Sequence, residues 1–221
     1  MPIDSGAPVD GGAPVDSGAP VDICSACAES EYCDEGFCQE RGCPPGSTTL
    51  VLGPAFVRHA EVRVKASLGQ TTLGAVTERG AGDDDGSYIF ANHAGLSGAE
   101  IRYDHAQAPS LEGRKIVGVN VRARSRRTEQ DVRAQVGLAI GFYFKSRAGR
   151  ALDPRYNTAH MFNTVVYTLA TYFQAQHPWD KRDWQASDLE DIEILINLKP
   201  DSLQNEVRVT QAWLEVCHAP L

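Results

Sequence analysis

The stretch Asn205-Glu-Val-Arg-Val-Thr-Gln-Ala-Trp-Leu-Glu-Val216 decides the fold class. Its β-branched and polar residues alternate with a period of two, which is the pattern of a strand in a β-sheet. In strict alternation, one face carries Val207, Val209, Gln211, Trp213 and Glu215, and the other carries Arg208, Thr210, Ala212, Leu214 and Val216. Neither set is wholly polar, so we expect a strand that is partly covered on both faces, with Trp213 in the core.

Runs of the same kind recur upstream of this strand, between turns that contain Gly, Asp or Pro. They are Leu50–Leu52, Glu61–Lys65, Ser87–Phe90, Glu100–Tyr103, Ile116–Arg124, Arg133–Phe144, Thr164–Ala170 and Glu193–Leu198. Short alternating runs at regular spacing are typical of antiparallel sandwiches. We therefore predict an all-β domain over residues 47–221, an antiparallel β-sandwich of about nine strands.

One short helix is predicted within this domain. Ser187-Asp-Leu-Glu190 fits a capping box, in which the Ser hydroxyl accepts a backbone N–H and the Glu carboxylate reaches back to the first amide. The helix should cover residues 188–192 and lead directly into the strand that begins at residue 193.

Residues 1–22 differ in composition from the rest of the chain. Three copies of a repeat that ends in Ala-Pro-Val-Asp contain Val as their only sizeable apolar residue. Such a segment cannot bury enough surface to offset its conformational entropy, so we predict a flexible linker that its prolines partly extend. Its composition resembles the linkers behind the lipid-anchored cysteine of exported bacterial lipoproteins, which hold a domain away from a surface.

Residues 23–46 form a cysteine-rich module with few core residues. The six cysteines of the chain are Cys24, Cys27, Cys33, Cys38, Cys43 and Cys217. Their even number indicates disulfides. We predict a Cys43–Cys217 bridge, because these residues adjoin the first and last strands and the ends of a domain often lie close together. The other four would pair among themselves, or they would bind zinc through Cys24-x2-Cys27 and Cys33-x4-Cys38.

The charge balance of the chain limits its partners. The formal net charge is -8 and the pI is near 5.2, which argues against nucleic acid, since phosphates require a basic surface. Arg122 and Arg124 alternate along a strand-like run, so we expect them on a solvated sheet face. No apolar run approaches the ~18 residues that a membrane-spanning helix needs.

The N-terminus, Met1-Pro-Ile-Asp4, lacks the basic and apolar regions of a signal peptide. Either export is not used, or the signal has been removed. The linker and the cysteine arithmetic favour an extracellular or cell-surface location. A phage virion, whose parts are made without a signal peptide, is the alternative.

The order of motifs over residues 47–221 resembles a known kind of domain. Asp83-Asp-Asp-Gly-Ser-Tyr-Ile89 is followed by the Ile116–Arg124 strand, by Trp184-x3-Asp188-Leu189 and by the final strand. This order is similar to that of jelly-roll-like sandwich domains in bacterial surface proteins and in phage tail or fibre proteins. The resemblance implies a binding, decorating or structural module without a catalytic set, and it implies that Trp184 packs over the helix start.

A cation site is one candidate function for the acidic turn. Asp83, Asp84 and Asp85 stand beside a glycine turn, and Ca²⁺ prefers such clustered carboxylate oxygens. The alternative is an acidic turn whose side chains bond nearby backbone amides.

Ligand-binding candidates lie in two other segments. The 177–184 loop offers Trp179, Asp180 and Arg182, which combine an aromatic face with polar groups as sugar sites do. Tyr103-Asp-His105 offers groups that could polarise a sugar or coordinate a metal. We therefore predict ligand contact by Tyr103 and by the three loop residues.

Catalytic motifs are missing from the sequence. It contains neither a Gly-x-Ser-x-Gly elbow nor a phosphate loop. We predict a non-enzymatic module that binds a polysaccharide or another cell-surface partner. A structural subunit of a fibre or virion, which packs against copies of itself, is the first alternative. A hydrolase on the same fold, with two carboxyl groups at a set separation, is the second.

Overall fold

The computed structural model describes residues 31–34, 37–40, 43–77, 86–91, 98–128, 137–147, 160–161, 168–199 and 206–221. The chain divides into two compact units, Met1–Gln39 and Glu40–Leu221. At the end of the first unit, β1 (Glu31–Asp34) and β2 (Phe37–Glu40) form a two-stranded sheet. The predicted linker, Cys24 and Cys27 lie outside the described residues.

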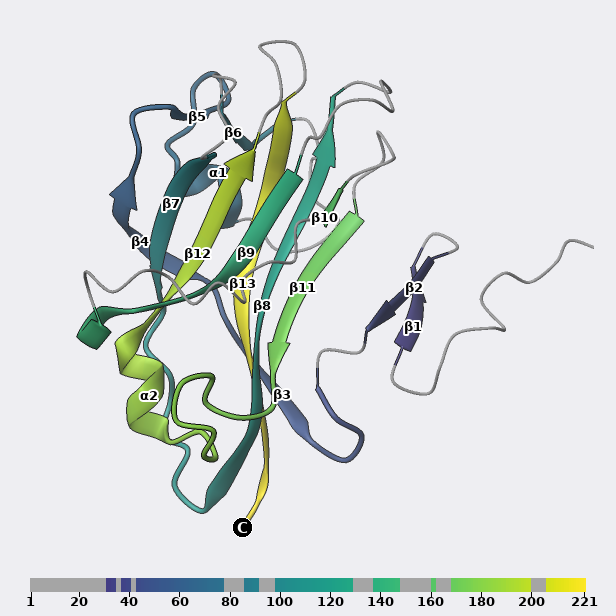
Figure 1. The fold of residues 1–221 in the computed structure, drawn as a ribbon, viewed down its shortest axis with the longest axis vertical. Coiled ribbons are helices and arrows are strands. Elements are labelled where there is room, and N and C mark those ends of the chain that lie inside the picture. Colours follow the sequence, from purple (N-terminus) through teal and green to yellow (C-terminus); the bar gives the residue numbers. More distant parts are fainter. Residues whose placement is uncertain are drawn as a thin grey trace, which may run out of the picture. The chain divides into compact units, whose positions relative to one another are not determined.

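Two antiparallel sheets make up the second unit, as Figure 1 shows. The five-stranded sheet has the order β10-β9-β12-β7-β4 and contains β4 (Pro54–Ala60), β7 (Ala99–His105), β9 (Gly137–Phe144), β10 (His160–Met161) and β12 (Ile192–Lys199). The six-stranded sheet has the order β11-β8-β13-β6-β5, with β3 also paired to β13, and contains β3 (Thr48–Leu52), β5 (Val64–Ala66), β6 (Ile89–Ala91), β8 (Arg114–Arg127), β11 (Thr168–Gln174) and β13 (Val207–Pro220). The predicted all-β sandwich is confirmed.

The strands from β6 to β13 follow the order of a jelly roll. β6, β13, β8 and β11 lie side by side in one sheet, and β7, β12, β9 and β10 lie side by side in the other. Strands that follow one another in the chain, such as β12 and β13, therefore mostly lie in opposite sheets. Both inner faces supply the core, and its fully buried residues include Ile101, Ile140, Ile194, Val121 and Leu214.

The segment before β7 departs from the prediction. Residues 54–60 form β4, which we did not predict, and the strand predicted at 61–65 is reduced to β5. β4 begins with a proline and makes two register shifts against β7, so its sequence lacks the alternation that marks a regular strand. A second helix, α1 (Gly74–Thr77), was also not predicted.

A bulge in β13 reverses the predicted faces. The pairing with β8 shifts register between Val209 and Gln211. Val207 and Val209 face the core before this bulge, whereas Ala212, Leu214 and Val216 face it afterwards. One inserted residue moves every later side chain to the other face. The strict alternation was therefore wrong across the bulge, and Trp213 is half-buried on the outer face, not in the core.

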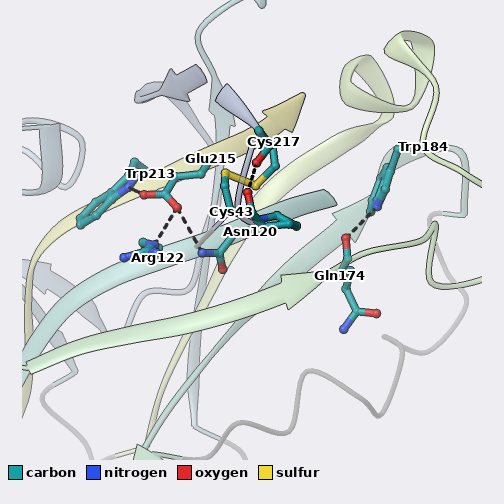
Figure 2. The surroundings of a disulfide bond; sticks show 10 residues. Cys43, Asn120, Arg122, Gln174, Trp184, Trp213, Glu215 and Cys217 are labelled. Atoms are coloured by element: carbon teal, nitrogen blue, oxygen red, sulfur yellow. Dashed lines mark hydrogen bonds and ion pairs between the residues drawn. A yellow bond between two sulfur atoms is a disulfide. The ribbon is translucent and has the colours of Figure 1, made fainter. Parts of the chain in front are cut away.

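The predicted Cys43–Cys217 disulfide is confirmed. The two Cα atoms lie 5.2 Å apart, and 174 residues separate the cysteines in the sequence. Cys217 is fully buried at the end of β13 (Figure 2). The bridge therefore closes nearly the whole sandwich into one covalent loop, which lowers the entropy of the unfolded chain.

A polar cluster lies on the outer face beside this disulfide; we call it the Glu215 cluster (Figure 2). The Glu215 carboxylate contacts the Arg122 guanidinium at 2.7 Å, and it accepts hydrogen bonds from Asn120 at 3.3 Å and Trp213 Nε1 at 3.0 Å. The Asn120 Oδ1 in turn accepts the backbone N–H of Tyr172 in β11. The prediction of a solvated Arg122 was wrong, because its side chain is only 7% exposed.

Two short helices are the only α-helices in the described part of the chain. α1 has four residues and α2 (Ala186–Asp191) has six, and α2 leads directly into β12 as predicted. Neither is long and apolar enough to cross a membrane.

Candidate functional site

A cleft of about 640 Å³ opens at one end of the sandwich. Four segments far apart in the sequence form it: β4, the end of β7 with the connection that follows it, the residue that follows β9, and α2. The lining residues are Ala55, Phe56, Asp104, His105, Gln107, Ala108, Pro109, Ser110, Leu111, Glu112, Lys145, Ala186, Ser187, Leu189 and Glu190. The lining combines seven apolar residues with eight polar or charged ones, and its size is that of a small-ligand site.

An ion-pair cluster, the Asp104 cluster, forms part of the cleft wall. The Asp104 carboxylate contacts Lys145 Nζ at 2.8 Å and Arg58 Nε at 2.5 Å. Burial raises the cost of ionising this carboxyl group, but the hydrogen bonds and charges of Lys145 and Arg58 outweigh that cost and hold its pKa below the ordinary value. The cluster therefore keeps a charged, hydrogen-bonding surface at the cleft at neutral pH.

An aromatic platform stands next to this cluster. The Phe56 ring is 44% exposed, and the Arg58 guanidinium lies over it at 4.3 Å from the ring centroid. Both residues are on β4. A cation over one face of a ring contributes about 0.5–1 kcal/mol at an exposed site, so Arg58 favours this orientation of the Phe56 ring, which lines the cleft.

Two side chains satisfy the C-terminal carbonyl groups of α2. His105 Nε2 lies 2.7 Å from the Leu189 oxygen, and Lys145 Nζ donates to the Glu190 oxygen at 2.8 Å. The last carbonyl groups of a helix lack partners inside the helix, and basic side chains at this end are favourable. These contacts fix α2 as a wall of the cleft against β7 and β9.

The beginning of α2 is fixed by the loop in which we predicted ligand contacts. Arg182 binds both carboxylate oxygens of Asp188 at 2.7 Å, and the same carboxylate accepts the Gln185 N–H at 2.7 Å. Burial opposes ionisation of Asp188, yet these hydrogen bonds hold its pKa below the ordinary value. The helix therefore begins after Gln185, and the predicted Ser187–Glu190 capping box was wrong.

The other predicted ligand residues make contacts within the domain. Tyr103 is fully buried, burial raises its pKa, and its hydroxyl donates to the Thr72 oxygen at 2.8 Å. Trp179 is half-buried against the core, and Asp180 lies 3.2 Å from His177 Nδ1. None of Tyr103, Trp179, Asp180 and Arg182 lines the cleft, so ligand contact by them stays a prediction.

Trp184 packs as the family resemblance implied. Its ring is 4% exposed and contacts Phe142, Phe144 and His177, while its Nε1 donates to the Gln174 oxygen at 3.0 Å. These aromatic contacts form the base on which the 177–184 loop and the start of α2 rest.

A second group of charges continues from Asp104 across the outer face of the five-stranded sheet. Arg102 lies 3.1 Å from Glu100 and 3.4 Å from Glu193, and its guanidinium covers the Tyr143 ring at 3.8 Å. Burial raises the pKa of Glu193, with Arg102 opposing and Asp104 adding to that shift. Neighbouring carboxyl groups therefore have pKa values displaced in opposite directions.

Metal sites have no support in the described residues. Within the described ranges, no group of three His, Cys, Asp or Glu side chains is placed to hold a metal ion. Asp83, Asp84 and Asp85, the predicted calcium ligands, lie outside those ranges, as do Cys24, Cys27 and the side chains of Cys33 and Cys38. The choice between disulfides and zinc for these four cysteines stays a prediction.

Comparison with known proteins adds no identification. No family model matches the chain, and no curated protein matches it.

Proposed function

We propose that the chain is a non-enzymatic, surface-attached binding module, and that the cleft between β4, α2 and residues 105–112 takes a carbohydrate. The cleft itself is the observation that carries this proposal. It is large enough for a small oligosaccharide segment, and all of its parts are fixed by contacts within the domain.

The chemistry of the lining suits a sugar. Sugar rings present an apolar face and several hydroxyl groups, and Phe56 together with Pro109 and Leu111 offers matching apolar surface. Ser110, Ser187 and Gln107 bring neutral donors and acceptors to the same cleft, while Glu112 and Glu190 bring carboxylates. Arg58 and Lys145 together hold the single carboxylate of Asp104, so the Asp104 cluster keeps one positive charge in excess.

The attachment at a surface rests on the sequence. The linker-like residues 1–22 precede the cysteine-rich module, and the fold agrees with the resemblance to jelly-roll-like domains of surface proteins. A tethered binding domain would have its ligand site on the sandwich and its linker at the N-terminal side.

A glycan array tests the proposal. The wild-type chain and the Phe56→Ala variant are applied to neutral, acidic and amino-sugar polysaccharides. We expect wild-type binding to at least one class and at least tenfold weaker binding by Phe56→Ala, because loss of one aromatic contact of about 1.4 kcal/mol changes Kd tenfold.

Two control variants locate the site. Leu68 is fully exposed and outside the cleft lining, so Leu68→Ala should bind as the wild type does. Trp179→Ala tests the loop that the sequence favoured, and a loss confined to this variant would move the site to the 177–184 loop. Binding of no glycan by the wild type would overturn the proposal.

A further inference from the structure

The edges of the two sheets are not equally protected against strand addition. An open edge presents backbone donors and acceptors to other chains, and proteins blunt such edges with short strands, prolines, charges and bulges. β10 and β5 have two and three residues. β4 begins with Pro54, contains Arg58 and is bulged at two places. Three of the edges formed by described strands therefore carry such a device.

β11 and β3 carry none of these devices. Both are free of charge, proline and glycine, with the sequences Thr-Leu-Ala-Thr-Tyr-Phe-Gln and Thr-Thr-Leu-Val-Leu. β11 is the longer, with seven residues, and it pairs with β8 in one unbroken register from Thr168 to Gln174. Among the described strands, β8 is the only one that pairs with β11.

We propose that two copies of this chain associate by antiparallel pairing of β11 with β11, centred on Thr171. The six-stranded sheets of the two copies would then form one continuous sheet across a two-fold axis. In such an isologous contact, a residue that precedes Thr171 on one strand lies opposite the residue that follows Thr171 by the same number of positions on the other strand.

The sequence of β11 is complementary to itself in this register. Pairing about Thr171 places Leu169 of one copy opposite Phe173 of the other, twice in each dimer. All three residues lie on the outer face of the sheet, since the intervening Ala170 and Tyr172 belong to the core. Leu169 and Phe173 are both half-buried in the single copy, and aromatic–aliphatic pairs of this kind stabilise neighbouring strands. No like charges oppose each other.

The Phe173 ring packs on its own sheet. It lies so close to Gly118 of β8 that a Cβ atom there would come within 2.4 Å of it. The proposed β11–β11 contact is independent of the carbohydrate cleft, because no residue of β11 lines that cleft.

Cysteine cross-linking tests the register. Residues opposite each other in an antiparallel pair have Cα atoms about 4.5–5.5 Å apart, which suits a disulfide. Under oxidising conditions we expect Thr171→Cys to give a covalent dimer. Leu169→Cys alone or Phe173→Cys alone should give no covalent dimer, because the two copies of the same cysteine would be about 14 Å apart at 3.4 Å per residue. An equal mixture of the two variants should give a covalent dimer.

Sedimentation equilibrium of variants without an added cysteine tests whether β11 is the edge that pairs. Thr171→Glu opposes two carboxylates at the axis, yet within one copy it stands opposite Arg122, so folding should be kept. We expect at least tenfold weaker dimerisation. Val51→Lys, on β3, is the matched control, because it stands opposite Glu215 as Thr171→Glu stands opposite Arg122, and it should dimerise as the wild type does.

Three results would overturn the proposal. The first is a wild-type chain that is monomeric up to about 1 mM, where association is worth only about 4 kcal/mol. The second is equal cross-linking of Leu169→Cys and Thr171→Cys, and the third is dimerisation that is lost in Val51→Lys and kept in Thr171→Glu. Dimerisation with no glycan binding would leave this inference intact and overturn only the proposed function.

Discussion

The Glu215 cluster and the Asp104 cluster are built from the same parts and differ in what surrounds them. Each consists of a carboxylate that contacts cationic or donor groups from other segments of the chain. In the Glu215 cluster, Arg122 and Glu215 are 7% and 11% exposed. In the Asp104 cluster, the carboxylate is 8% exposed but Arg58 and Lys145 are 49% and 35% exposed. The first is enclosed beside a disulfide, whereas the second borders the cleft.

This difference separates the structural role of the Glu215 cluster from the proposed binding role of the cleft. A buried ion pair cannot exchange its partners for a ligand or for water, and breaking it leaves a charge in a poorly solvated site. A half-exposed pair adds little to stability, but it can meet a ligand without large rearrangement. The two clusters should therefore respond differently to matched changes.

Removal of the disulfide beside the Glu215 cluster should have the largest effect. For a loop of 174 residues, the chain-entropy treatment gives about 5 kcal/mol of lost stability. The variant is Cys43→Ser with Cys217→Ser, and urea unfolding measures the change. A loss below about 1 kcal/mol would show that the unfolded chain is already restricted by other contacts.

Neutralising the carboxylate of Glu215 or of Asp104 should have the second largest effect on stability and should distinguish the two clusters. We expect Glu215→Gln to lower the free energy of unfolding by about 3 kcal/mol, because Arg122 stays buried without that charge. Asp104→Asn should cost about 1 kcal/mol or less, since both of its cations can turn to water. Chemical unfolding of the two variants checks this, and equal losses would remove the distinction between the clusters.

The smallest expected effect is on the pH dependence of the free energy of unfolding. The neighbouring carboxyl groups of Asp104 and Glu193 should contribute to it with opposite signs. The pKa of Asp104 is lowered in the folded state, so its contribution is present above the ordinary Asp pKa and is lost as pH falls. The pKa of Glu193 is raised, so its contribution is present below the ordinary Glu pKa and is lost as pH rises.

Unfolding between about pH 3 and pH 7, around the ordinary carboxyl pKa values, measures these contributions. The stability difference between wild type and Asp104→Asn should grow as pH rises, and that between wild type and Glu193→Gln should shrink. Parallel trends would contradict the assignment of the two pKa shifts. Each change should stay below about 1 kcal/mol, because the cations that face these carboxylates, Arg58, Lys145 and Arg102, keep part of their surface in water.

The regular parts of the fold were predictable from local sequence. Alternation located β7, β8, β12 and β13, and the position of two cysteines located the Cys43–Cys217 bridge. Irregular pairing was not predictable. The bulge after Val209 inserts one residue between two apolar stretches, and nothing in the composition marks where the phase changes. β4 was missed for the same reason.

The cleft could not be read from the sequence, because its walls come from segments that only the fold brings together. Phe56, His105, Lys145 and Glu190 carry no shared spacing. One local signal existed: Phe56 and Arg58 stand together in a short segment that begins with proline, as exposed aromatic sites on irregular edges do. The 177–184 loop was a stronger signal in sequence, and in the structure its Arg182 fixes α2 through Asp188.

The Cys43–Cys217 bridge has a mechanical consequence. The predicted linker and most of the cysteine-rich module precede Cys43, and Cys217 lies near the end of β13. A force that pulls on the segment before Cys43 reaches two points of the fold at once: β3 through the backbone and β13 through the sulfur atoms. β3 therefore cannot be peeled from the edge of the sheet by tension in a tether, because the pull is transferred covalently to the strand at the centre of the sheet. Tension between the two ends of the domain would pass from Cys43 to Cys217 and bypass the folded strands between them.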